Sequence, residues 1–200
     1  MSARLRRAGF SALAAGIACL TLAACADQPV QLSHSYSPMD SLGETSHPLP
    51  AGRAPCRVRL ANVQDLRDDP QAAGTFSERF VHAEDAPAWL RSGLLSISRD
   101  SRLQLSDQTG AAADLEIRVD LLKLYMLTIN EAKSANVVVR VHYAGQNAER
   151  DNDKVYRGAF TSVNWTGAAG EARGALDTAL SKVLEDVDQD LLTRCATAKR

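Results

Sequence analysis

The segment that most constrains the fold is the longest periodic run of the chain, from Glu171 to Arg194. Apolar residues recur there every three or four positions and form one stripe of a predicted helix: Ala172, Leu176, Ala179, Leu180, Val183, Leu184, Val187 and Leu191. A helix with a single apolar stripe must bury that stripe against another layer. We therefore expect the preceding sequence to provide that layer.

The sequence before this helix is rich in predicted strands. Polar and apolar residues alternate in 57–63 and 115–121, a short strand holds Leu103 and Leu105, and a polar turn separates two further strands at 137–143 and 155–165. The run 122–129 is apolar on both faces, which is typical of a strand covered on both sides. A helix that Asp85 can cap places Trp89, Leu90, Gly93, Leu94 and Ile97 on one face.

This element order predicts the fold class. Strand, helix, four strands and helix (β-α-β-β-β-β-α) indicate an α+β domain. We expect a mainly antiparallel sheet with the two helices packed on one face.

The N-terminus has the pattern of a bacterial lipoprotein signal peptide at 1–24. Arg4, Arg6 and Arg7 precede an apolar stretch of 17 residues, Ala8 to Ala24, which is shorter than the about 20 residues of a membrane span. It ends in Leu22-Ala23-Ala24-Cys25, which resembles the lipobox, where the cysteine is acylated with fatty acids such as palmitate and becomes the new N-terminus. We expect lipidation at Cys25.

The residues after Cys25 indicate a flexible tether and the membrane in which the protein is anchored. The range 25–55 contains five of the seven prolines and many serines, so we expect a flexible linker there and a periplasmic domain at 56–200. In lipoproteins of Gram-negative bacteria an aspartate directly after the lipidated cysteine marks inner-membrane retention. Ala26 stands there and the aspartate follows at Asp27. The sequence therefore favours the periplasmic face of the outer membrane.

Two cysteines remain in the expected domain, Cys56 and Cys195. In an oxidising compartment they are natural partners, and a bridge would join the two ends of the domain. The alternative is two separate thiols. No C-x-x-C spacing is present to favour a redox-active site.

No motif in the chain indicates catalysis. His82 and His142 have no nucleophile beside them in sequence, and neither a G-x-S-x-G elbow nor a phosphate-binding loop occurs. We predict no enzyme activity, no cofactor and no metal site. Removal of Arg4, Arg6 and Arg7 leaves 20 basic against 24 acidic residues, a balance that disfavours nucleic-acid binding.

The loop after the first strand contains Asp65 and Arg67, which are open to two interpretations. They could pair to hold the loop, or they could contact an anionic ligand or a partner. The aromatic residues have a similar ambiguity, because they could fill the core or line a groove between helix and sheet: Trp89, Tyr125, Tyr143, Tyr156 and Trp165.

The lipobox, the proline-rich tether, the segment Val63-Gln64-Asp65-Leu66-Arg67 and the element order together resemble the YajG-like envelope lipoproteins. The plan is also similar to the PqiC-like auxiliary lipoproteins of lipid-handling ABC transporters. Neither resemblance implies catalytic residues. Both imply an outer-membrane lipoprotein that acts by binding.

The function expected from the sequence is therefore that of a non-enzymatic envelope lipoprotein whose tethered domain binds another envelope protein. The alternative is an auxiliary component of an ABC-type transport system that binds a lipid or another hydrophobic ligand. The apolar run at 122–129 motivates this alternative.

Overall fold

The structure is a computed structural model that describes residues 29–37, 55–97, 102–110, 112–144 and 153–198. Cys25, the expected signal peptide and most of the expected tether lie outside these residues. The described elements follow one another along the chain in the order β1 (Val30–Gln31), β2 (Cys56–Asp65), β3 (Ala72–Phe76), β4 (Arg79–His82), α1 (Ala86–Ser96), β5 (Leu103–Ser106), β6 (Leu115–Ile129), β7 (Ala132–Ala144), β8 (Asp153–Val163) and α2 (Ala169–Ala198).

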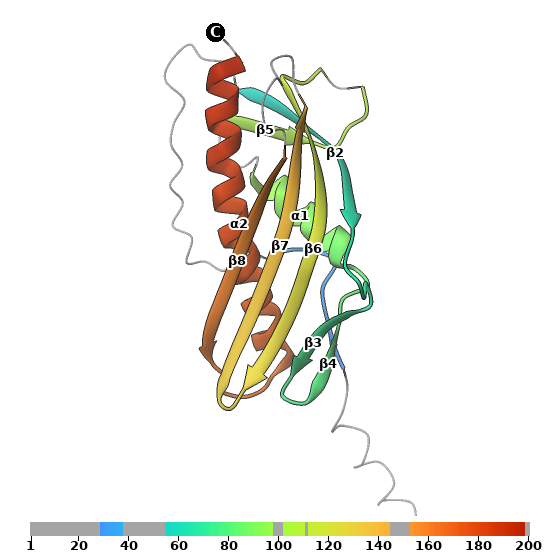
Figure 1. The fold of residues 1–200 in the computed structure, drawn as a ribbon, viewed down its shortest axis with the longest axis vertical. Coiled ribbons are helices and arrows are strands. Elements are labelled where there is room, and N and C mark those ends of the chain that lie inside the picture. Colours follow the sequence, from blue (N-terminus) through green and yellow to red (C-terminus); the bar gives the residue numbers. More distant parts are fainter. Residues whose placement is uncertain (1–28, 38–54, 98–101, 111, 145–152, 199–200) are drawn as a thin grey trace, which may run out of the picture.

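The strands form one mixed sheet of eight (Figure 1). β6, β7 and β8 make the expected antiparallel meander, and β3 and β4 form a second antiparallel hairpin. Four pairs are parallel: β1 with β4, β2 with β5, β2 with β6 and β3 with β6. The expectation of a mainly antiparallel sheet is therefore wrong, because alternation along a strand reports its buried face but not the direction of its neighbours.

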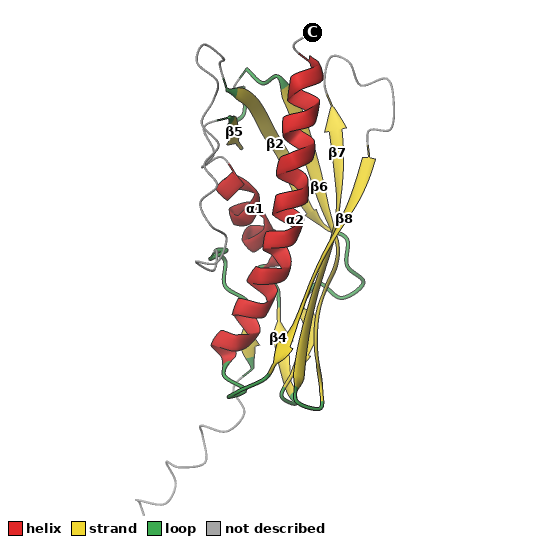
Figure 2. Cartoon of the chain, turned by 90° about the vertical axis from the view of Figure 1, so that its left-hand side faces the viewer, coloured by secondary structure: helices red, strands yellow, loops and turns green. Residues whose placement is uncertain are grey.

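Both described helices pack on the same face of the sheet, as expected (Figure 2). α1 contacts β2 and β5, whereas α2 lies along β7 and β8 and also touches α1. The predicted stripe of α2 is buried between helix and sheet, and the apolar residues predicted for α1 are buried with it, except for the partly buried Ile97. Asp85 precedes α1 but makes no capping bond with its side chain, which instead lies 3.0 Å from His34.

A β-bulge explains why the run 122–129 looks apolar on both faces. The register with β7 shifts between Leu121 and Lys123, so the buried positions change from odd to even numbers along β6. Leu124 and Met126 are buried, while Tyr125, Leu127 and Ile129 are exposed at 38%, 42% and 58%. The interpretation that this strand is covered on both sides is therefore wrong.

Three strands were not predicted from the sequence. β3 and β4 occupy the segment expected to be a loop, and their turn at Ser77 and Glu78 has positive φ at both residues. β1 lies within the range expected as a tether, and Val30, Leu32 and Tyr36 are buried. Tyr36 shares a hydrogen bond of 2.6 Å with Ser181 of α2. This part of the expected tether is thus packed against the domain.

Cys56 and Cys195 form a disulfide that joins the start of β2 to the last part of α2. Their Cα atoms lie 6.0 Å apart, and they are separated by 139 residues in sequence. The bridge favoured by the sequence is therefore present. A cross-link over so long a loop restricts the unfolded chain and, on the chain-entropy model, stabilises the fold by about 4 to 5 kcal/mol.

We predict that Gly158→Ala destabilises the fold by about 1 to 3 kcal/mol, measured as the free energy of unfolding in denaturant. A Cβ atom at Gly158 would lie 1.8 Å from the carbonyl oxygen of Ala179, so α2 would have to move away from β8. Gly170→Ala is the matched control, because a Cβ atom there meets nothing within 4 Å. Equal stability of the two variants would contradict this account of the packing.

Candidate functional site

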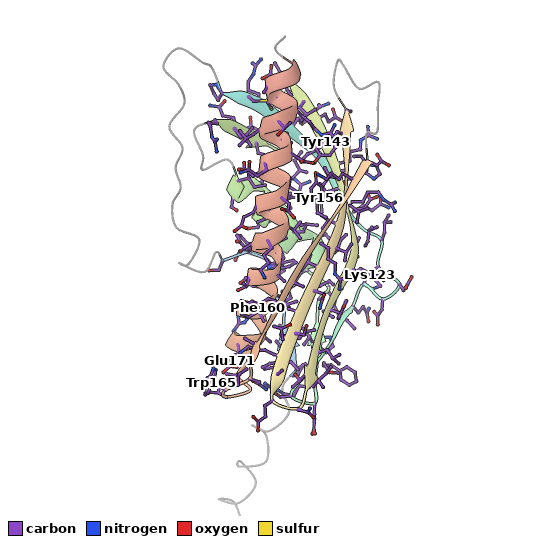
Figure 3. All side chains as sticks on the ribbon, turned by 60° about the vertical axis from the view of Figure 1, so that its left-hand side comes forward. Lys123, Tyr143, Tyr156, Phe160, Trp165 and Glu171 are labelled. Atoms are coloured by element: carbon purple, nitrogen blue, oxygen red, sulfur yellow. A yellow bond between two sulfur atoms is a disulfide. The ribbon has the colours of Figure 1, made fainter. Side chains whose placement is uncertain are left out.

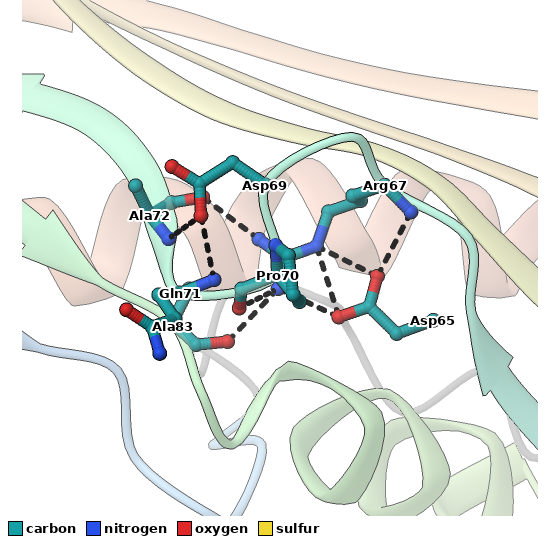
Figure 4. Close-up of polar contacts among 7 residues, drawn as sticks. All are labelled: Asp65, Arg67, Asp69, Pro70, Gln71, Ala72 and Ala83. Atoms are coloured by element: carbon teal, nitrogen blue, oxygen red, sulfur yellow. Dashed lines mark hydrogen bonds and ion pairs between the residues drawn. The ribbon is translucent and has the colours of Figure 1, made fainter.

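Arg67, a predicted contact for a ligand or partner, is directed into the protein. Its side chain is 4% exposed, and it binds the Asp65 carboxylate through Nε at 2.9 Å and through Nη2 at 2.7 Å. The guanidinium also donates to the carbonyl oxygens of Pro70, Ala72 and Ala83 (Figure 4). These bonds connect the loop after β2 to β3 and to the residue that follows β4. The geometry therefore favours the interpretation that Asp65 and Arg67 hold this loop.

The buried polar groups next to the helices are also engaged inside the fold. Trp89 Nε1 donates to Asp177 Oδ1 at 2.7 Å, and burial raises the pKa of Asp177 despite this bond. On the same helix the Ser181 hydroxyl donates to the Asp177 carbonyl at 2.9 Å. This cluster connects α1 with α2, and through Tyr36 with the segment after β1.

A second internal cluster lies between α2 and the meander, around Tyr143 and Tyr156 (Figure 3). The two hydroxyls share a hydrogen bond, and Tyr156 donates to Asp190 Oδ2 at 2.6 Å. Burial raises the pKa of both tyrosines. Burial alone would raise the pKa of Asp190 as well, but hydrogen bonds from Lys154 and Tyr156 lower it. These aromatic residues, like Trp89, belong to the core, whereas Tyr125 and Trp165 are exposed.

A histidine flanked by two carboxylates lies on the outer face of the sheet. His142 Nε2 is 2.7 Å from Asp120 Oδ2, and Nδ1 is 2.8 Å from Asp153 Oδ1. The hydrogen bond to Asp120 is the largest cause that raises the pKa of His142. Both ring nitrogens are therefore engaged with carboxylates of the protein itself. The arrangement is that of a surface ion-pair network that joins three strands.

The described residues contain no group of three or more His, Cys, Asp or Glu side chains placed to hold a metal ion. A shallow depression between the β3–β4 turn and the loop 164–168 is lined mainly by polar atoms. Within the described part of the chain, no helix has the length and apolar character needed to cross a membrane.

The remaining candidate is the outer edge of β8, which sequence reasoning missed. β8 is 11 residues long and pairs with β7, and no other described strand lies on its second side. Asn164 N donates to Glu131 O at 2.7 Å, so the even-numbered residues of β8 bond to β7. The odd-numbered residues therefore direct their N–H and C=O groups away from the sheet: Val155, Arg157, Ala159, Thr161 and Val163. Alternation in sequence cannot reveal which strand ends the sheet.

One of these outward groups has a partner on α2. Lys182 Nζ donates to the carbonyl oxygen of Ala159 at 2.7 Å, which agrees with the outward direction of this residue. A lysine at a sheet edge is a device that limits unspecific strand pairing. The edge is thus protected at one position along its length.

Comparison with known proteins assigns the chain to no family. No family model matches it, and neither does any curated protein. Similar solved structures include a Xanthomonas campestris protein at 11% identity, with 86% of this chain and 96% of that chain covered and a TM-score of 0.43. A minor lipoprotein of Acinetobacter baumannii is 7% identical, with 67% of this chain and 94% of that chain covered and a TM-score of 0.38. The lipoprotein GNA1162 of Neisseria meningitidis is 8% identical, with 68% of this chain and 99% of that chain covered and a TM-score of 0.38.

We predict that Ala159→Pro is better tolerated than Ser162→Pro. The Ala159 N–H points away from β7, so a proline there removes no hydrogen bond between the two strands. The Ser162 N–H donates to β7, so a proline there removes that bond and leaves a carbonyl oxygen of β7 unpaired. We expect Ser162→Pro to cost about 1 to 3 kcal/mol and Ala159→Pro to cost less. Thermal unfolding of both purified variants measures the difference, and the reverse order would refute the assigned edge.

We predict a pH-dependent role for Glu171, whose carboxylate organises the loop before α2. It accepts hydrogen bonds from Lys133 Nζ at 2.6 Å and from Thr166 N at 2.9 Å, and these bonds, the one from Lys133 above all, lower its pKa to about 2. A lowered carboxylate pKa gives stability that is present above the unfolded value of 4.5 and is lost as pH falls toward 2. Glu171→Gln should therefore be less stable than the parent at pH 7.

The measurement is denaturant unfolding of the parent and Glu171→Gln from pH 7 to pH 2. The stability difference should stay constant down to about pH 5 and shrink below it. If the difference in the free energy of unfolding between the two proteins does not depend on pH, the charge of Glu171 contributes nothing to stability.

Proposed function

We propose that this protein is a non-enzymatic envelope lipoprotein, anchored by lipid at Cys25 to the periplasmic face of the outer membrane, whose domain binds another envelope protein. The observation that carries the binding role is the edge of β8, beside which no other described strand lies. The sequence Leu22-Ala23-Ala24-Cys25 supports the anchor, and Ala26 supports the outer membrane.

The edge of β8 suits an extended segment of a partner. A strand added beside β8 would form main-chain hydrogen bonds with the outward groups of the odd-numbered residues, and such bonds provide affinity in strand addition. The side chains of these residues are exposed on the outer face. They include the apolar Val155 and Val163 and the charged Arg157, so they can select the side chains of the added strand.

The geometry gives less support to a carrier for lipid or another hydrophobic ligand. That alternative rests on a strand apolar on both faces, and the bulge after Leu121 accounts for this pattern without an internal cavity. The exposed residues of β6 lie on the outer face of the sheet, and the helices cover the other face. Binding through the surface is therefore favoured over binding in the interior.

We predict that a photoreactive amino acid placed at Arg157 crosslinks to an envelope protein in living cells. Arg157 lies on the exposed edge, two residues from Ala159, and Ala159→Pro should abolish the adduct because it removes an N–H group that the partner needs. A photoreactive residue at Glu185, on the exposed side of α2, is the matched control and should give no such adduct.

Two outcomes would contradict the proposal. One is the absence of an adduct from Arg157, and the other is an adduct that persists unchanged in the Ala159→Pro background. Mass spectrometry of the mature N-terminus tests the anchor separately, because it measures whether Cys25 carries acyl chains.

A further inference from the structure

Exposed apolar side chains gather at one end of the domain. Phe80 is 67% exposed, Ile129 58%, Val163 47% and Trp165 82%. These four residues, called here the apolar tip, lie at the ends of β4, β6 and β8 and in the loop that follows β8. Grouped exposed apolar residues on a protein surface indicate contact with a partner or a membrane.

The apolar tip is supported by three turns that are bonded to one another. Asn164 Nδ2 donates to Ser77 Oγ at 2.8 Å, and Asn164 N donates to Glu131 O at 2.7 Å. Arg79 donates to the carbonyl oxygen of Gly167. The β3–β4 turn, the β6–β7 turn and the loop before α2 therefore form one end of the molecule, where Trp165 lies close to Glu171 (Figure 3).

The chain enters the domain at this same end. β1 runs parallel to β4, and Val30 pairs with Val81. Because β4 starts at the turn of Ser77 and Glu78, the Val30 end of β1 is the end of that strand that lies nearer the apolar tip. Cys25 lies five residues before Val30. Five residues span at most about 18 Å, so an acyl group on Cys25 cannot lie far from this end.

We propose that the apolar tip lies in the lipid–water interface of the membrane that holds the acyl chains of Cys25. This inference rests on the lipid anchor of the proposed function. Tryptophan favours the level of the lipid headgroups because its ring is amphipathic. Phenylalanine is one of the apolar side chains that segments at a membrane surface bury at the boundary between headgroups and acyl chains. The anchor confines the tip to the membrane surface, so each apolar side chain adds to binding without a separate cost of association.

The charges at the tip indicate that anionic lipid is not needed. Glu78 and Glu131 are exposed there, whereas the nearby Lys133 is paired with Glu171 at 2.6 Å and Arg79 with Gly167. Exposed carboxylates are not attracted to an anionic surface. The contact is therefore apolar, and vesicles of neutral phosphatidylcholine should suffice.

The test uses the full lipidated protein in phosphatidylcholine vesicles, with and without bromine on the acyl chains. Bromine quenches tryptophan fluorescence on contact, and the two tryptophans differ, since Trp165 is 82% exposed and Trp89 is fully buried. We expect brominated lipid to reduce the emission. Trp165→Phe should remove this quenching and leave the emission of Trp89, which serves as an internal control.

Surface variants separate the tip from the rest of the domain. Phe80→Ser with Ile129→Ser should reduce the quenching of Trp165, whereas Leu66→Ser with Val155→Ser, at exposed apolar sites outside the tip, should not. Circular dichroism of both double variants checks that they are folded.

Each remaining outcome decides the inference. Acylated Cys25 with unquenched Trp165 overturns the inference and leaves the anchor in place. Unmodified Cys25 in mass spectrometry overturns both. A third outcome is that bromine does not quench Trp165, while its fluorescence changes with the number of protein molecules per vesicle. This result would indicate that the tip contacts a second copy of the protein, and it would contradict the proposal.

Discussion

The close packing of α2 on the sheet is the contact on which the rest of the structure depends. Gly158 lets the backbone of α2 approach β8, and Gly93 lets α1 meet Leu180 of the same helix. The stripe of α2 is then buried against β7 and β8, and the helices and the sheet share one core. Close packing of this kind contributes both transfer energy and dispersion contacts. The disulfide at Cys195 secures the far end of the same helix to β2.

Polar groups inside the domain serve this packing, among them the pair Asp65 and Arg67, which the sequence had left open as a contact for a ligand or partner. Arg67 joins its loop to β3 and to the residue after β4, and Asp177 joins both helices through Trp89. Burial of a polar group costs free energy unless the group forms hydrogen bonds. Each of these side chains is therefore fixed in place by its hydrogen-bond partners. Side chains saturated in this way have little capacity left for a ligand. Among the described residues, the edge of β8 and the exposed apolar groups are not used in this packing.

The two surfaces that remain differ in place and in chemistry. The edge of β8 offers backbone donors and acceptors along the length of the sheet, and the apolar tip offers side chains at the end where the chain enters. A domain anchored through its tip would direct the long axis of the sheet away from the membrane. The first part of β8 would then lie furthest from the lipid, in reach of a periplasmic partner. The tip and the recognition edge share Val163, at the end of β8, whereas the first part of the edge lies apart from the tip.

The sequence by itself determined the elements whose signal is local. The stripe of α2, the face of α1 and the three strands of the meander follow from periodicity, and the number of cysteines in the expected domain, with an expected oxidising compartment, favoured the pairing of Cys56 with Cys195 over two separate thiols. Only the tertiary structure decided strand direction, the bulge after Leu121, the short strands β1, β3 and β4, and the inward direction of Arg67. These features arise from contacts between residues distant in the chain, and periodicity within a single element carries no information about its neighbours.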